Sequence, residues 1–314
     1  MLRVLCWPGM PAAAALGEAA RRIGTTVTTE VVASNERLEA RLREDRFDVA
    51  FPSDYLVERL LARRELLALE PPQALVAQLA PWARAAAHDP GCRWSLPFAF
   101  GTTGYLCTAE LAGGRAWADL LEPPPGVRVG MLDEVREVVG AALIAAGHSP
   151  NDASAEALAG ARERLLRQRP SVVRYDSSDF VGPLVRGEVA AHQAWSGPAA
   201  VAARRHEGLR YVLPQEGANL WLTAGAVPVG ARRPEAARQL LFALCDPELA
   251  ALTTRAEGYA TPNEAARARL AATLRRDRTL FPPELTLRRC TTFRDLGADE
   301  ARLVRLYEEV ATAS

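Results

Sequence analysis

The sequence contains no lysine, so all 38 of its basic residues are arginine, and 38 acidic residues balance them. A formal charge of zero gives no electrostatic attraction for nucleic acid or for an anionic membrane. The longest apolar run, Val138 to Ala146, is far shorter than the roughly 20 residues of a membrane-spanning helix. Trp7-Pro8-Gly9 interrupts the short apolar start of the chain, which is not typical of a secretory signal. Taken from Met1, the sequence alone would indicate a cytoplasmic protein.

Metal-ligand spacings and common catalytic motifs are also missing. The five Cys and four His residues show no CxxC, CxxH or HExxH pattern, so no metal site is expected. There is no GxSxG nucleophile elbow and no GxxxxGK[ST] phosphate loop. These absences disfavour an enzyme, and the sequence predicts no cofactor.

Short β-branched or apolar segments alternate with helical ones, and the alternation restarts in the middle of the chain. The predicted strands are 3–6, 25–32, 47–51, 127–130, 171–175, 189–194 and 210–213. The predicted helices include 11–23 with Gly24 at its end, one that Ser34 begins, one that starts at Pro52, one that runs past Ala146, and 154–169. This order predicts an α/β fold of mixed, mostly parallel sheets with helices on both faces.

The restart of the pattern predicts two lobes. Extended crossovers are expected near 99–104 and 220–224. The first lobe is predicted to hold residues 1–102 and 221–270, and the second 103–220 and 271–314. Two lobes joined by hinges are typical of proteins that close around a ligand, so we expect a crevice that traps a small molecule by hinge closure.

Aromatic and acidic residues gather where the predicted strands and crossovers end, which is where open α/β sheets bind ligands. Trp7, Trp195 and Trp221 lie at such ends, and Glu134 and Glu137 follow the strand at 127–130. Carboxylates accept charge-assisted hydrogen bonds from ammonium groups, and indole faces hold cations and methylene chains. The pattern therefore favours a small organic cation as ligand.

Several segments, in order and at similar spacing, give the chain a family resemblance. They are 34–36, 47–55, 95–98, 116–120, 133–138, 187–189, 195–197 and 258–263. On these segments the chain resembles, nearly end to end, the periplasmic spermidine/putrescine-binding proteins of polyamine ABC transporters. The resemblance implies the two-lobed periplasmic-binding-protein fold with two hinge crossovers.

By position, the resemblance also implies a set of ligand-binding residues. They are Trp7, Ser53, Tyr55, Glu134, Glu137, Trp195, Trp221, Thr223 and Tyr259. The rings would enclose the carbon chain of the ligand, Ser53 would offer a hydroxyl group, and Glu134 and Glu137 would hold an amino group. Arg136, between the two glutamates, is expected to orient Glu137.

The chain also departs from the family pattern. Thr223 stands where polyamine binders have an acidic residue, and Pro8 and Met10 replace polar and aromatic residues. Arg294 falls near a neutral polar contact of the family. Asp54, at the start of a predicted helix, is expected to offset free backbone N–H groups and not to bind ligand.

The resulting prediction is a substrate-binding protein of an ABC-type importer for a putrescine- or spermidine-like amine. An amino-acid-like zwitterion of the 4-aminobutyrate type is an alternative ligand, and a ligand-sensing lobe outside transport is an alternative role. The predicted partners are the small amine, an ABC permease and its ATPase, with no nucleic acid, and the protein is predicted to be a monomer. The resemblance implies a periplasmic location, with a signal peptide outside this sequence.

Overall fold

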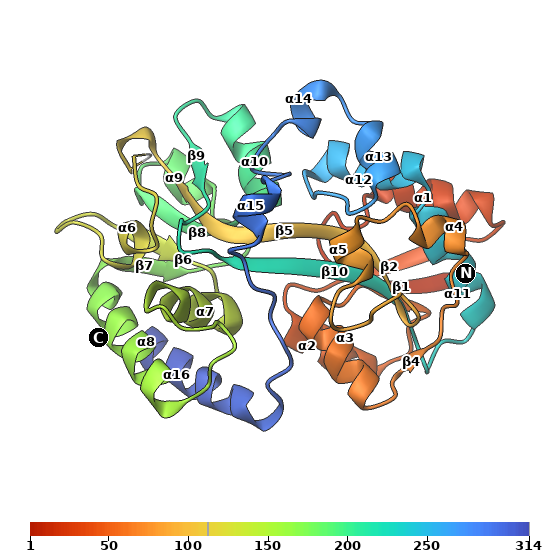
Figure 1. Ribbon diagram of the computed structural model, residues 1–314, viewed down its shortest axis with the longest axis horizontal. Coiled ribbons are helices and arrows are strands. Elements are labelled where there is room, and N and C mark those ends of the chain that lie inside the picture. Colours follow the sequence, from red (N-terminus) through yellow and green to blue (C-terminus); the bar gives the residue numbers. More distant parts are fainter. Residues whose placement is uncertain (112, 314) are drawn as a thin grey trace. The chain divides into compact units, whose positions relative to one another are not determined.

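The chain forms two compact units in the computed structural model, which describes residues 1–111 and 113–313 (Figure 1). Unit 1 consists of residues 1–100 and 221–281, and unit 2 of residues 101–220 and 282–314. The chain therefore passes from one unit to the other at three places, after Phe100, Leu220 and Phe281.

Unit 1 is built on a mixed sheet. Strand β1 (Leu2–Cys6) runs parallel to β2 (Val27–Val31) on one side and to β3 (Val49–Ala50) on the other. Strand β10 (Asn219–Pro228) is antiparallel to β3 and pairs as well with β4 (Leu66–Leu67). The helices of this unit are α1 (Ala13–Arg22), α2 (Asn35–Glu44), α3 (Asp54–Ala62), α4 (Gln73–Val76), α5 (Pro81–Arg84), α11 (Pro234–Leu244), α12 (Pro247–Glu257), α13 (Glu264–Ala268) and α14 (Ala272–Arg275).

The strands of unit 2 are likewise mixed in direction. The second half of β5 (Ser95–Cys107) is antiparallel to β8 (Ala191–Trp195) and to β9 (Arg210–Val212). Strand β6 (Val129–Met131) is parallel to β8 and to β7 (Val172–Tyr175). The remaining elements are η1 (Ala109–Leu111), α6 (Ala118–Leu121), α7 (Val135–Ala145), α8 (Ala155–Gln168), η2 (Arg169–Ser171), α9 (Gly182–Val185), α10 (Ser196–Arg205), α15 (Glu284–Leu287), η3 (Gly297–Asp299) and α16 (Glu300–Thr312).

Helices α7, α8 and α16 lie side by side and form the main core of unit 2 (Figure 1). Helix α7 is almost wholly apolar, and its residues from Val138 to Leu143 are buried. Leu165 of α8 and Leu303 of α16 are fully buried in the same cluster. Each such side chain stabilises the fold by roughly 1.5–3 kcal/mol through burial, so α7 is held firmly at its place beside β6.

Local signals in the sequence place several element ends. The Ser34 hydroxyl accepts the Arg37 N–H at 3.1 Å and so caps α2, as predicted. Gly24, with φ of +65°, follows α1 in the left-handed conformation that ends helices. The prediction that one helix runs past Ala146 is wrong, because α7 ends at Ala145 and Gly147 takes a φ of +82°.

The segment 271–281 belongs to unit 1, whereas the sequence analysis had assigned it to the second lobe. Its last residues are apolar, and Leu280 is fully buried. The Phe281 ring packs edge-on against Phe100 at 6.1 Å and lies under the guanidinium of Arg267 at 4.3 Å. These contacts join residues far apart in sequence, which a composition pattern does not reveal.

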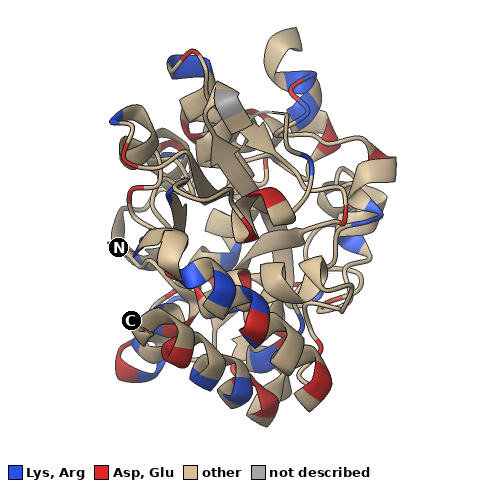
Figure 2. Ribbon diagram, turned by 90° about the vertical axis from the view of Figure 1, so that its left-hand side faces the viewer, with Lys and Arg blue, Asp and Glu red and all other residues tan. Residues whose placement is uncertain are grey.

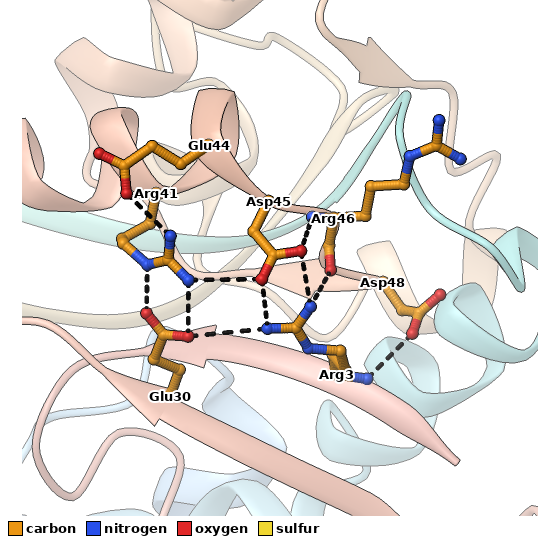
Figure 3. Close-up of polar contacts among 7 residues, drawn as sticks. All are labelled: Arg3, Glu30, Arg41, Glu44, Asp45, Arg46 and Asp48. Carbon is orange, nitrogen blue, oxygen red and sulfur yellow. Dashed lines mark hydrogen bonds and ion pairs between the residues drawn. The ribbon is translucent and has the colours of Figure 1, made fainter.

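Arginine side chains form networks of ion pairs and hydrogen bonds that connect the strands and helix α2 of unit 1. Arg3 on β1 donates to Asp45 at 2.9 Å and to the Arg46 carbonyl at 3.0 Å (Figure 3). Arg41 on α2 donates to Glu30 on β2 and to Asp45. The planar guanidinium suits such multiple contacts, although pairs this exposed contribute little individually. Arg and acidic residues alternate along the helices and do not gather by sign (Figure 2).

His192 is a fully buried histidine in β8. Its Nδ1 lies 2.7 Å from the Gln193 carbonyl, and its Nε2 has no hydrogen-bond partner in the described part of the chain. The ring packs tightly over Gly130, since a β-carbon there would lie 2.1 Å from Cδ2. Burial lowers the pKa of His192 from 6.5 to about 4, so the folded protein holds this imidazole neutral.

We predict that the free energy of unfolding falls between pH 6.5 and 4 because of this group. The unfolded state binds the proton from about pH 6.5 downward, whereas the folded state resists it until about pH 4. The loss is roughly 3 kcal/mol, at about 1.4 kcal/mol per pKa unit. Urea unfolding at a series of pH values would measure it in the wild type and in the variants His192→Gln and His206→Gln. His206→Gln is the control for loss of an imidazole. If His192→Gln keeps the wild-type dependence of the free energy of unfolding on pH, His192 is not the group responsible.

Candidate functional site

Glu137 is the most constrained carboxylate in unit 2. It lies in the first turn of α7 and is buried. Its Oε1 accepts three hydrogen bonds, from Thr103 Oγ1 at 2.9 Å, Asn219 Nδ2 at 3.0 Å and Trp195 Nε1 at 3.3 Å. Oε2 receives no hydrogen bond from any residue that the structure describes. One oxygen is thus fixed in place, and the other is available to a donor from outside the chain.

Burial raises the pKa of Glu137 above its ordinary value of 4.5, and the three donors oppose that rise only in part. A buried carboxylate with a raised pKa gains free energy when a cation approaches, because the cation favours its ionised form. The local chemistry therefore favours a positively charged partner at Oε2.

Trp195 contacts Glu137 from a neighbouring strand, whereas Glu134 is close to it in sequence. Trp195 ends β8, and its indole N–H is held by Glu137 while its ring packs edge-on against Phe180 at 6.3 Å. Glu134 is the half-buried residue that precedes α7, and it lies one turn before Glu137. Glu134 has an extended backbone and stands just outside the helix, so its role in binding stays a prediction.

Arg136, in the first turn of α7, contacts the segment that contains Phe293 and Arg294. Arg136 donates to the Arg294 carbonyl at 3.0 Å and to Asn151 Oδ1 at 2.8 Å, and its guanidinium lies 4.6 Å from the Phe293 ring centroid. The side chains of Thr103, Asn219 and Trp195 donate to Oε1 of Glu137, and the positive charge of Arg136 favours the ionised form of Glu137. Arg294 is exposed, and its backbone N–H also donates to Asn151.

Three of the aromatic residues implied by the resemblance come together in unit 1. The indole N–H of Trp7 donates to the Phe51 carbonyl at 2.6 Å at the end of β3. The Tyr259 hydroxyl donates to the Pro8 carbonyl at 3.3 Å, next to Trp7. The rings of Trp221 and Tyr259 meet edge-on at 6.2 Å. The first loop, β10 and the segment after α12 thus contribute to one aromatic cluster.

Ser53, just after β3, and Thr223, within β10, are neighbouring hydroxyl residues of unit 1. Ser53 and Thr223 form an antiparallel bridge between their backbones. Asn35 at the start of α2 holds Ser53, since its Nδ2 donates to Ser53 Oγ at 3.0 Å and its Oδ1 accepts the Ser53 N–H at 3.1 Å. Thr223 is buried. These groups are neutral, so they add polarity to unit 1 without charge.

Tyr55 and Asp54 are buried at the start of α3. The Tyr55 hydroxyl donates to Glu36 at 3.3 Å, and the Arg59 guanidinium lies 5.9 Å from its ring centroid. This places Tyr55 in packing between α2 and α3, and its role in binding stays a prediction. Asp54 Oδ1 accepts the Tyr55 N–H at 2.9 Å, as a carboxylate at a helix start does.

Sequence reasoning missed Thr103 and Asn219, which donate to Glu137. Both belong to the extended segments that the sequence identified as crossovers, β5 and β10. The signal would have been polar residues within strands that are rich in apolar residues, because a buried polar side chain needs a partner. Asn219 also keeps a buried Oδ1 without a hydrogen bond in the described part of the chain.

No helix within residues 1–111 and 113–313 has an apolar stretch long enough to cross a membrane. The same residues contain no group of three or more His, Cys, Asp or Glu side chains that could hold a metal ion.

Comparison with known proteins identifies several relatives of this chain. Residues 24–282 match the family model described as bacterial extracellular solute-binding protein. The chain is 29% identical over 306 residues to spermidine/putrescine-binding periplasmic protein 1 of Haemophilus influenzae, covering 95% of this chain and 85% of that protein. It is 28% identical over 296 residues to the spermidine/putrescine-binding periplasmic protein of Escherichia coli, covering 92% and 84%. A solved structure from Listeria monocytogenes, described as a spermidine/putrescine ABC transporter, has a TM-score of 0.91 at 25% identity and covers 99% of this chain and 98% of its own.

The chain therefore belongs to the bacterial extracellular solute-binding protein family. The predicted resemblance and the predicted fold class, the periplasmic-binding-protein fold, are confirmed by these relatives. The prediction of a solute-binding protein and not an enzyme is confirmed as well.

We predict that Glu137→Gln weakens the binding of putrescine at least tenfold, whereas Asp54→Asn changes it less than threefold. A hydrogen bond to a charged group contributes about 1.5–3 kcal/mol, and about 1.4 kcal/mol is a factor of ten. Titration calorimetry on both variants and the wild type would measure the affinities. If Asp54→Asn has the larger effect, the binding carboxylate has been placed in the wrong unit.

Proposed function

We propose that this chain binds a small amine of the putrescine/spermidine class as the substrate-binding component of an ABC-type importer. The observation that carries the proposal is Glu137, a buried carboxylate with Oε1 held by three donors and Oε2 left without one among the described residues. A buried carboxylate of this kind is costly unless a charged group pairs with it. An ammonium group supplies the charge and the hydrogen bond together.

The aromatic residues support an amine that carries a hydrocarbon chain. Trp195 adjoins Glu137 in unit 2, and Trp7, Trp221 and Tyr259 form the cluster in unit 1. Ring faces attract cations by about 0.5–2 kcal/mol and pack against methylene groups. Aliphatic polyamines offer both features, because they are methylene chains that end in ammonium groups.

The charges favour a polyamine over an amino-acid-like zwitterion. The charged members of the predicted set, Glu134 and Glu137, are both acidic. A ligand carboxylate would need a cationic partner, and Arg294 is exposed with its backbone engaged by Asn151. Thr223, which replaces an acidic residue of the family pattern, lowers the negative charge of unit 1 but adds no positive charge.

The names of the relatives support the cellular role. The similar proteins of Haemophilus influenzae and Escherichia coli are called periplasmic, and we propose the same compartment here. The partners would be an ABC permease with its ATPase, and the protein would act as a monomer. A ligand-sensing role would use the same binding chemistry and differ only in the partner.

We predict that ligand-stripped protein binds putrescine and spermidine at least tenfold more tightly than 4-aminobutyrate. The second ammonium of a diamine is attracted by the acidic set, whereas the carboxylate of 4-aminobutyrate is repelled by it. Titration calorimetry against putrescine, spermidine, agmatine and 4-aminobutyrate would give the order. If none of the four compounds binds, the amine proposal is refuted and the family assignment stands. If 4-aminobutyrate binds most tightly, a zwitterionic ligand is favoured.

A further inference from the structure

The first loop of unit 1 is a tight turn from Trp7 to Met10. The Met10 N–H donates to the Trp7 carbonyl at 3.1 Å. Pro8 occupies the second position and Gly9, with φ of +67°, the third. A positive φ at the third position with proline at the second defines a type II turn, which favours glycine.

The end of helix α12 lies against this turn. Gly258 takes the left-handed conformation, with φ of +79°, just after Glu257, the last residue of the helix. Tyr259 then donates from its hydroxyl to the Pro8 carbonyl. Glu257 packs its carboxyl group over Gly9, where a β-carbon would lie 2.6 Å from Oε2 and 2.8 Å from the carboxyl carbon. The turn therefore favours glycine at position 9, and the missing β-carbon leaves the space that the Glu257 carboxyl group occupies.

The Glu257 carboxylate has no hydrogen-bond or ion-pair partner among residues 1–111 and 113–313. It is half-buried, and it stands at the C-terminal end of an eleven-residue helix, where the helix dipole disfavours negative charge. Burial of Tyr259, together with the negative charge of Glu257, raises the pKa of Tyr259 to about 12. This carboxylate is thus placed where a cation would be stabilised by both the side chain and the helix end.

Glu257 lies close in sequence to the aromatic cluster of unit 1. Tyr259 is two residues away and packs edge-on against Trp221. The indole N–H of Trp221, whose residue is 8% exposed, has no hydrogen-bond partner in the described part of the chain. The cluster that Tyr259 joins thus holds a buried donor without a partner among the described residues, and Glu257, two residues before Tyr259, is a carboxylate without one. Buried polar groups are normally hydrogen-bonded, so both groups are open to a ligand.

We propose that Glu257 is the carboxylate that binds a ligand ammonium in unit 1. This inference rests on the proposed function, since it assumes an amine ligand. A diamine presents two ammonium groups, and the residues implied by the resemblance supply acidic groups from unit 2 alone, with Thr223 neutral in unit 1. Glu257, whose carboxyl group packs over Gly9 in the first loop, supplies the acidic group of unit 1. Selectivity for a diamine over a monoamine then depends on this residue.

The test compares Glu257→Gln with the wild type for two ligands, putrescine and n-butylamine, by direct and competition calorimetry. Gln keeps the shape of the side chain and removes its charge. We expect the affinity for putrescine to fall at least tenfold, as for a lost charge-assisted hydrogen bond. The affinity for n-butylamine, which has one ammonium for Glu137, should change less than threefold. Glu264→Gln, at an exposed glutamate in α13, is the matched control and should change neither.

Two further measurements keep the outcomes distinct. Glu257→Asp should retain part of the preference for putrescine, and thermal unfolding should show that both variants keep the wild-type midpoint. Unchanged putrescine affinity in Glu257→Gln, or an equal loss for both amines, would overturn the role of Glu257 alone. Failure of the wild type to bind either amine would refute the proposed function, and this inference with it.

Discussion

Oε1 of Glu137 accepts hydrogen bonds from β5, β8 and β10 at once, through Thr103, Trp195 and Asn219. No other carboxylate of the predicted set receives side-chain donors from three strands in the described part of the chain. These bonds stabilise the charge of one oxygen, fix the rotamer of Glu137 and orient the Trp195 indole beside it. Removal of the carboxylate would leave three donors without a buried acceptor, and each such group costs about 1–3 kcal/mol. The three donors therefore depend on Oε1 of Glu137 as their acceptor.

The packing of α7 explains why this carboxylate is located so firmly. Its apolar residues are buried against α8 and α16, and Arg136 ties the first turn of the helix to Asn151 and to the Arg294 carbonyl. These contacts of α7 keep Glu137 next to its donors on β5, β8 and β10. The first turn of α7 therefore combines tight apolar packing with a buried carboxylate, and the side chains that donate to Glu137 offset the cost of burying it.

Much of the fold and part of the site could be predicted from the sequence, because their signals are local. The β-branched runs, the Ser34 cap and Gly24 mark element ends through backbone chemistry within a few residues. The donors to Glu137 and the contact of Glu257 with Gly9 could not be predicted, since they join residues 34 to 248 positions apart. The placement of 271–281 in unit 1 depends in the same way on Phe281 meeting Phe100. Family resemblance located residues such as Tyr55 by position, but it did not show that the Tyr55 hydroxyl donates to Glu36.

The central claim is that Glu137 becomes the ionised partner of a ligand ammonium, and proton release on binding tests it most directly. Burial raises the pKa of Glu137 in the free protein, and a bound ammonium would lower it again, so binding must release protons where the free carboxyl is partly protonated. Calorimetry with putrescine, in buffers of different ionisation enthalpy from pH 8 down to pH 5, counts those protons. We predict a net release in the wild type and its loss in Glu137→Gln. Binding without proton release at every pH, or the same release in Glu137→Gln, would contradict it.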